Sequence, residues 1–151
     1  MIAVVAYLHS LSMIALGSLL FAQLLSINKL HDRQQLQHFL LFCIGVAVAA
    51  FVILASGIAL TFWSERGGAF YLHNPVFYIK LAVFAAMLLV AITPARIVLQ
   101  WGREARLGTV PESASVVIVK RYVVVELILL LVVPLAASLA AQGIGLQSSS
   151  S

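Results

Sequence analysis

Four long runs of apolar residues, separated by short polar stretches, dominate the sequence. They extend over residues 2–27, 37–63, 75–95 and 116–142. Each run exceeds the roughly 20 residues that a helix needs to cross about 30 Å of hydrocarbon, and none shows the alternation of a membrane β-strand. Because lipid offers no partner for free backbone groups, we expect these runs to be helices. The pattern predicts an all-α fold, a four-helix transmembrane bundle.

Polar residues beside the apolar runs predict where the helices begin and end. Asn74 followed by Pro75 is typical of an N-cap and first-turn pair. Thr109 and Glu112 have the spacing of a capping box, which indicates that the last helix begins before the membrane. We expect one domain over residues 1–147, with helices at about 2–27, 37–63, 75–107 and 111–142, and a flexible serine tail at 148–151.

Composition agrees with lipid as the main solvent of the chain. Hydrophobic residues make up 63% and charged residues 9% of the 151 residues, with a mean hydropathy of +1.10, far from the balance of soluble globular proteins. The first run has no preceding Lys or Arg and is longer than the core of a secretory signal, which favours a retained helix. The net charge of +4 does not indicate nucleic acid, because the basic residues flank the apolar runs. The expected partners are the lipid bilayer and a membrane protein partner or a second copy of the chain.

The distribution of basic residues predicts the orientation of the helices. The first connection contains Lys29 and Arg33, and the third is flanked or occupied by Arg96, Arg103, Arg106, Lys120 and Arg121. The second connection has only Arg66, and neither terminal segment has a Lys or Arg. The positive-inside rule then places the first and third connections in the cytoplasm and both termini on the outer side. Trp63 is expected at the outer membrane interface, and Trp101 and Tyr122 at the inner one.

One histidine lies within the first apolar run. His9 is about 10 Å from the outer end of its helix at a rise of 1.5 Å per residue, and an ionisable group in hydrocarbon is a functional candidate. Helical periodicity puts Ser12, Met13, Leu16 and Gln23 on the same face. We therefore expect this stripe to point into the bundle. Counting along the other helices places residues 55–57, residues 135–138 and Lys80 at the level of His9.

Two interpretations of His9 follow from these neighbours. Small residues around one buried histidine leave room for a planar cofactor whose metal His9 would ligate. Small residues also allow membrane helices to approach closely, in which case His9 is a hydrogen-bonded structural residue. His73 lies just before a helix N-terminus, where the dipole favours the neutral, metal-binding imidazole; it is either a second ligand or a polar loop residue. Arg66 and Lys80 are candidates for pairing with haem propionates, although Lys80 can equally snorkel to the headgroups.

Glu126 is the other buried charge. It lies about 7 Å into the last helix, at a depth similar to that of Arg96 on the third. Because intramembrane charges usually pair, a structural ion pair between Glu126 and Arg96 is favoured over a proton-relay role. Cys43 is the only cysteine and is expected to serve packing. No zinc-type Cys/His spacing and no CxxCH motif for covalent haem occurs in the sequence, and no set of catalytic residues can be assigned.

Several short motifs carry a resemblance to a known family. They are Tyr7-Leu8-His9, Arg66-Gly67-Gly68-Ala69, Tyr71-Leu72-His73-Asn74-Pro75, Phe77-Tyr78-Ile79-Lys80, and Glu126 ahead of Pro134. On these motifs the chain resembles an uncharacterised family of predicted bacterial four-helix membrane proteins, a domain of unknown function. This resemblance covers nearly the whole chain and implies a multi-pass protein of the bacterial inner membrane.

More distantly, the layout is similar to that of the four-helix membrane protoporphyrinogen oxidases and the copper-resistance D proteins. The oxidases carry a histidine in the first helix and a lysine early in a later helix, for which His9 and Lys80 are the counterparts here. The longer basic and tryptophan-rich motifs of the oxidases are missing from this sequence. Met13 is the only methionine near His9, so the soft-ligand cluster expected for Cu(I) is also missing.

These observations lead to one functional hypothesis with two alternatives. The chain is expected to bind b-type haem noncovalently near the outer leaflet, with His9 as the main metal ligand and His73 as the second, in electron transfer or haem-dependent oxidation. The first alternative is a cofactor-free structural or assembly subunit of a membrane complex, in which His9, Lys80 and Glu126 organise helix packing. The second is a copper-handling membrane protein.

Overall fold

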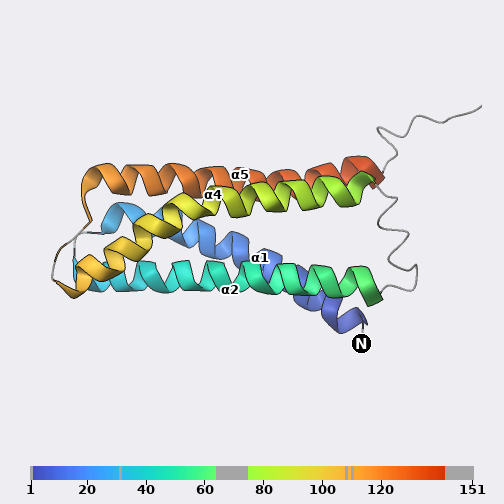
Figure 1. The fold of residues 1–151 in the computed structure, drawn as a ribbon, viewed down its shortest axis with the longest axis horizontal. Helices are drawn as coiled ribbons and strands as arrows, with labels where there is room; N and C mark the ends of the chain where they lie inside the picture. The colour runs from blue at the N-terminus through green and yellow to red at the C-terminus, as the bar shows by residue number, and fades with distance from the viewer. Residues whose placement is uncertain (1, 31, 64–74, 108, 110, 142–151) are drawn as a thin grey trace, which may run out of the picture.

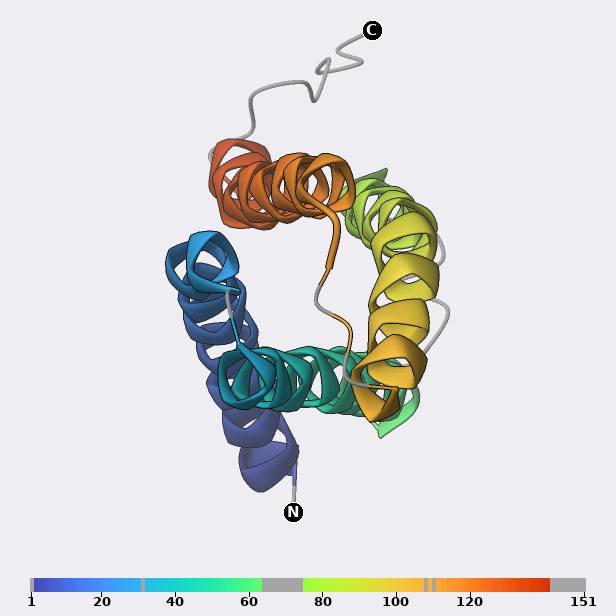
Figure 2. The same cartoon turned by 90° about the vertical axis from the view of Figure 1, so that its left-hand side faces the viewer.

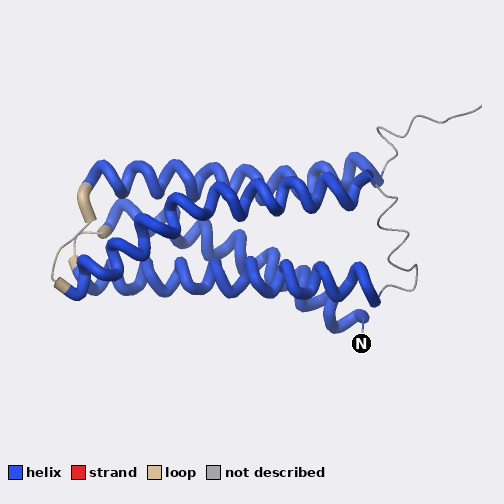
Figure 3. Tube along the Cα trace, viewed as in Figure 1, coloured by secondary structure: helices blue, strands red, loops and turns tan. Residues whose placement is uncertain are grey.

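Four long helices make up nearly all of the described chain. The computed structural model describes residues 2–30, 32–63, 75–107, 109 and 111–141, without the side chains of residues 75–77, 80 and 133–141. The elements are α1 (Ile2–Ser26), the 3-10 helix η1 (Ile27–Lys29), α2 (Arg33–Trp63), α4 (Pro75–Arg106) and α5 (Ser113–Ala141) (Figure 1). No strand occurs among these residues (Figure 3). The all-α bundle predicted from the apolar runs is confirmed.

The helices form two antiparallel pairs that stand side by side. α1 packs mainly against α2, and α4 mainly against α5. Smaller contacts of α1 with α5 and of α2 with α4 close the ring of helices that is visible along the bundle axis (Figure 2). Both intra-pair connections lie at the same end of the bundle, on the left in Figure 1. We call it the basic end, because Lys29, Arg33, Arg103, Arg106 and Lys120 gather there.

Three of the described helical segments are long and apolar enough to cross a membrane. They are Ile2–Lys29, Arg33–Trp63 and Leu81–Arg106. α5 has 29 residues, a comparable length, and it lies along α4 through the bundle (Figure 1). Its described part carries Lys120, Arg121 and Glu126. Large apolar side chains such as Ile14, Phe51, Leu89 and Leu131 are exposed on all four helices, as expected of surfaces that face lipid.

The second helix begins earlier than its apolar run predicts. α2 starts at Arg33 rather than at residue 37, because Asp32 caps it. The Gln35 backbone N–H donates to Asp32 Oδ1 at 2.8 Å, and the Leu36 N–H donates to the Asp32 carbonyl at 3.2 Å. An aspartate at this position satisfies a backbone donor that the first helical turn leaves free. The cap therefore stabilises the polar first turn of α2, which has no apolar side chains to place in lipid before Leu36.

Thr109 does not form the capping box predicted with Glu112. Its hydroxyl donates to the carbonyl of Glu104 at 2.8 Å, and its backbone N–H donates to the same carbonyl at 3.2 Å. Thr109 therefore caps the C-terminus of α4, where the last carbonyls have no helical partner. α5 begins at Ser113, and Ser115 donates to the Glu112 carbonyl at 2.7 Å. The predicted Asn74 cap and the serine tail at residues 148–151 lie outside the described residues.

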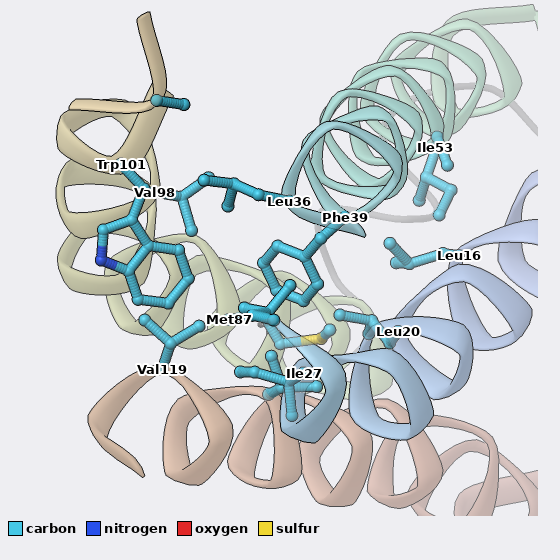
Figure 4. Packing of buried hydrophobic residues seen from close by; sticks show 14 residues of the cluster. Leu16, Leu20, Ile27, Leu36, Phe39, Ile53, Met87, Val98, Trp101 and Val119 are labelled. Carbon is cyan, nitrogen blue, oxygen red and sulfur yellow. The ribbon is translucent and has the colours of Figure 1, made fainter. Parts of the chain in front are cut away.

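The most tightly buried core lies towards the basic end. Leu20, Ile27 and Phe39 are fully buried there, together with Leu36 and Val119 (Figure 4). The rings of Phe39 and Trp101 pack at a centroid distance of 6.0 Å, within the range of favourable aromatic pairs. These contacts tie α1, α2, α4 and α5 together at one level.

The placement of Trp101 corrects a sequence-based expectation. Trp101 was expected at the inner membrane interface, but it is 2% exposed and belongs to the core. Its indole N–H donates to Ser115 Oγ at 3.2 Å, which satisfies the one polar atom of the buried ring. Trp63 is 60% exposed at the other end of the bundle, a position compatible with a membrane interface.

Candidate functional site

His9 lies between α1 and α2 at the end of the bundle opposite to the basic end. Its Nδ1 is 2.9 Å from Ser56 Oγ. A Cβ atom added to Gly57 would lie 3.4 Å from His9 Cε1, so the imidazole rests against the backbone of α2 at a position without a side chain. Helical rise predicted that His9 lies at the depth of residues 55–57, and His9 contacts α2 at these residues.

The surroundings of Ser56 indicate which nitrogen of His9 carries the proton. The Ser56 hydroxyl also lies 2.5 Å from the Val52 carbonyl and 3.2 Å from the Ile53 carbonyl of its own helix. A hydroxyl has one proton, and the α2 carbonyls accept it. Ser56 Oγ then accepts a hydrogen bond from Nδ1–H of His9. This network favours the tautomer in which the lone pair is on Nε2.

The polar stripe of α1 faces the interior, as its periodicity predicted. Ser12 is 8%, Leu16 3% and Gln23 5% exposed, and Met13 packs against the core. Burial of two polar residues on one face of an otherwise apolar helix is typical of a side that meets protein and not lipid. His9 is part-buried at the end of this stripe.

The other predicted haem-site residues are placed only in part. Arg66 and His73 lie outside the described residues. Lys80 belongs to α4, in the helical segment that begins at Pro75, but its side chain is not described. Residues 135–138, predicted at the level of His9, belong to α5 with their side chains likewise not described. The described geometry of this site therefore consists of His9 and its contacts with α2.

Glu126 and Arg96 differ in their surroundings. Glu126 is buried, with 6% of its surface exposed, whereas Arg96 is exposed on α4. Both side chains are described, and no ion pair joins them. The structure therefore does not bring together the two charges for which a structural ion pair was predicted.

A buried polar contact between two other helices lies near Glu126. Gln23 Nε2 of α1 donates to Cys43 Sγ of α2 at 3.2 Å, and the carboxyl group of Glu126 on α5 acts electrostatically on Cys43. Sequence reasoning assigned Cys43 to packing and did not connect these residues. The signal that points to the contact is the position of Gln23 on the buried stripe of α1, at a depth where Cys43 also lies on α2.

The comparisons with known proteins place the chain in a family. The family model described as "Predicted membrane protein (DUF2214)" matches residues 1–145. The chain belongs to DUF2214. No curated protein and no solved structure matches the chain. The DUF2214 match confirms the resemblance to a family of predicted membrane proteins, whereas the more distant similarity to the oxidases and the copper-resistance proteins stays a prediction.

DUF2214 membership agrees with the physical character of the bundle. The match covers all four helices, and the exposed apolar side chains on each of them require a lipid environment. The protein is a membrane protein with several apolar helices. Among the described residues, no group of three or more His, Cys, Asp or Glu side chains lies together, so a candidate ligand in this part of the DUF2214 chain has to be judged singly. His9 has a hydrogen bond to a neighbouring helix that favours one tautomer of its ring.

Proposed function

We propose that this membrane protein binds b-type haem noncovalently near one membrane surface, with His9 as the axial ligand. The observation that carries the proposal is the hydrogen bond between His9 Nδ1 and Ser56 Oγ at 2.9 Å. Histidines that ligate metals usually donate their other ring N–H to a neighbouring acceptor, which fixes the tautomer and the ring orientation. Ser56 supplies that acceptor, and Nε2 is then the nitrogen with the lone pair. A neutral imidazole with its lone pair on Nε2 is a form of histidine that ligates a haem iron.

The remaining roles extend the proposal to the other residues that the sequence suggested for this site. His73 would be the second axial ligand, and Arg66 and Lys80 would hold the propionates. Bound haem would supply one-electron chemistry, and the protein would take part in electron transfer or haem-dependent oxidation with a membrane protein partner. The bundle would hold the iron ligand in a dry, apolar environment, which is one of the ways a protein tunes a haem potential.

The proposal is tested by a reduced-minus-oxidised absorption spectrum of the protein purified in mild detergent from haem-replete cells. We expect a haem spectrum at near-stoichiometric occupancy, which is lost in His9→Ala. His38→Ala is the matched control, because His38 is an exposed histidine on the same helix pair at the basic end. A featureless spectrum of the unaltered protein, or equal loss in both variants, would contradict the proposal.

Ser56→Ala tests the supporting contact separately from the ligand. Removing the acceptor of the Nδ1–H should leave haem bound but weaken its retention by about 10- to 100-fold, the usual effect of losing such a partner. Haem titration of the purified protein measures this loss. Retention unchanged from that of the unaltered protein would show that the Ser56 contact does not orient a ligand.

A cofactor-free structural subunit is the second candidate, favoured by the same contact in another role. The His9–Ser56 hydrogen bond joins α1 to α2, and the imidazole fills the space beside Gly57. If packing is its purpose, His9→Gln should preserve the thermal stability of the bundle, and the unaltered protein should copurify with a membrane complex and without haem. Loss of a haem spectrum in His9→Gln, with the fold retained, would instead favour the ligand role.

We further propose that α5 is a fourth span and that both termini face the outer side of a bacterial inner membrane. Helices packed lengthwise in one bundle cross a bilayer together, and α5 lies along α4. The side with more Lys and Arg is usually cytoplasmic, and the basic end holds Lys29, Arg33 and Lys120.

A further inference from the structure

A groove at the basic end combines two cations with an apolar floor. It has a volume of about 620 Å³ and lies where η1 meets α5, lined by Asn28, Val116, Val117, Lys120, Arg121, Val124 and Val125. The lining contains no acidic side chain. The groove lies at the other end of the bundle from His9, so what binds there is independent of the haem proposal.

One of the two cations is held in place by a neighbouring element. Lys120 Nζ donates to Asn28 Oδ1 at 3.3 Å, across 92 positions of sequence. Lys120 is half-buried, whereas Arg121 beside it is exposed. A lysine that only snorkels to headgroups keeps its rotamer freedom. The hydrogen bond to Asn28 restricts the rotamers of Lys120. The groove therefore presents a positioned ammonium group and an adjacent guanidinium group.

The apolar side of the groove continues along the outside of α5. Val124 and Val125 line the groove and are 37% and 42% exposed. Further along the helix, Ile128 is 56% and Leu131 70% exposed. Positions three and four apart lie on one helix face, so an apolar strip leads from the cations towards the middle of the bundle. A ligand that fits this layout has an anionic head and a hydrocarbon tail.

We propose that the groove is a binding site for an anionic phospholipid of the surrounding bilayer. Lys120 and Arg121 would contact the phosphodiester, since ammonium and guanidinium groups form strong charge-assisted hydrogen bonds with phosphate oxygens. One acyl chain would lie along Val124, Val125 and Ile128. A free phosphate would use the cations but gain nothing from the valines, which is why the lipid is the better match. Basic pockets beside transmembrane helices are known to bind such headgroups.

The test measures binding of phosphatidylglycerol and phosphatidylcholine with identical acyl chains to the full chain in mild detergent, by native mass spectrometry. We expect phosphatidylglycerol to bind preferentially. In Lys120→Gln with Arg121→Gln, its affinity should fall about tenfold to thirtyfold, from roughly fivefold for each charge near a membrane surface. Arg103→Gln with Arg106→Gln is the matched control, which removes two charges at the same end outside the groove. The affinity of this control variant for phosphatidylglycerol should stay within about twofold of that of the unaltered protein.

Other outcomes decide against the proposal. Equal losses in the two double variants would mean diffuse attraction and no site. Competition by soluble glycerophosphoglycerol as strong as that by the lipid would assign the groove to a free phosphate compound. Should the charge variants fail to fold by circular dichroism, Asn28→Ala keeps both charges and releases Lys120. It should weaken phosphatidylglycerol binding severalfold, and unchanged binding would overturn the proposal.

Discussion

At the scale of single residues, the bundle buries polar side chains at two depths. His9 meets Ser56 at one depth, and Gln23 meets Cys43 near Glu126 at the other. Polar groups in a lipid-exposed bundle are costly unless they meet a partner, and each of these contacts joins two different helices. Buried polar pairs of this kind also specify which helix faces meet.

Glu126 and Arg96 provide a residue-scale prediction. Because no ion pair joins them, the effects of Glu126→Gln and Arg96→Ala on the free energy of unfolding should add within about 0.5 kcal/mol. Arg96→Ala alone should change it by less than about 0.5 kcal/mol, as is usual at exposed positions. A double-mutant cycle by denaturant titration in detergent measures the coupling. A coupling energy above about 1 kcal/mol would support the ion pair and contradict this prediction.

Counting along the helices predicts contacts between α1 and α2 better than contacts with the other pair. The meeting of His9 with residues 55–57 was predictable, because two adjacent antiparallel helices of known rise bring defined positions to one level. The contact of Gln23 with Cys43 follows the same register on the same two helices, but Cys43 was assigned to packing and was not compared with Gln23. Glu126 was assigned to Arg96 because equal depth was treated as proximity, but depth alone does not say how each helix is rotated, and Arg96 is exposed on α4.

At the scale of the elements, the helices extend beyond the segments that hydropathy identifies. α2 begins at Arg33, in a polar stretch outside its apolar run, and α4 continues to Arg106. Apolar runs report the lipid-exposed part of a helix, whereas its ends depend on capping. Asp32 and Thr109 supply these caps. Thr109 was assigned to the wrong helix because a residue between two helices can satisfy either the carbonyls behind it or the amides ahead of it.

Capping by Asp32 gives the prediction at this scale. Asp32→Ala removes the acceptor of the Gln35 N–H and should lower the free energy of unfolding by about 1 kcal/mol. Asp32→Asn is the matched control, because asparagine caps nearly as well as aspartate. Thermal unfolding in detergent, followed by circular dichroism, compares the three proteins. If Asn lowers the stability as much as Ala does, the charge of Asp32 matters and the cap does not.

At the scale of the whole molecule, charge is separated along the bundle axis. Both intra-pair connections and their basic residues lie at one end, and the N-terminus of α1 lies at the other (Figure 1). The separation follows from four antiparallel helices with basic residues in alternate connections, and it was predictable from the sequence. The fold does not say which side of the membrane each end faces; the positive-inside rule predicts it.

Cysteine accessibility tests that orientation. In a Cys43→Ser background, a cysteine at Arg103, in the basic end, should react with a membrane-impermeant reagent only after the cells are opened. A cysteine at Trp63, which is 60% exposed at the opposite end, is the matched control and should react in intact cells. The reverse pattern would invert the proposed topology, and reaction of both sites in intact cells would argue against a spanning bundle.

The pairing of the helices also bears on how the chain is made and inserted. α1 with α2, and α4 with α5, form two hairpins whose internal contacts exceed those between them, and each hairpin closes through a short capped connection at the basic end. Each half can therefore enter the bilayer as a complete unit during synthesis, before the other half exists. We expect the polypeptide to be divisible between Trp63 and Pro75, because two separately expressed halves would keep their intra-hairpin contacts and would need only to dock side by side within the membrane.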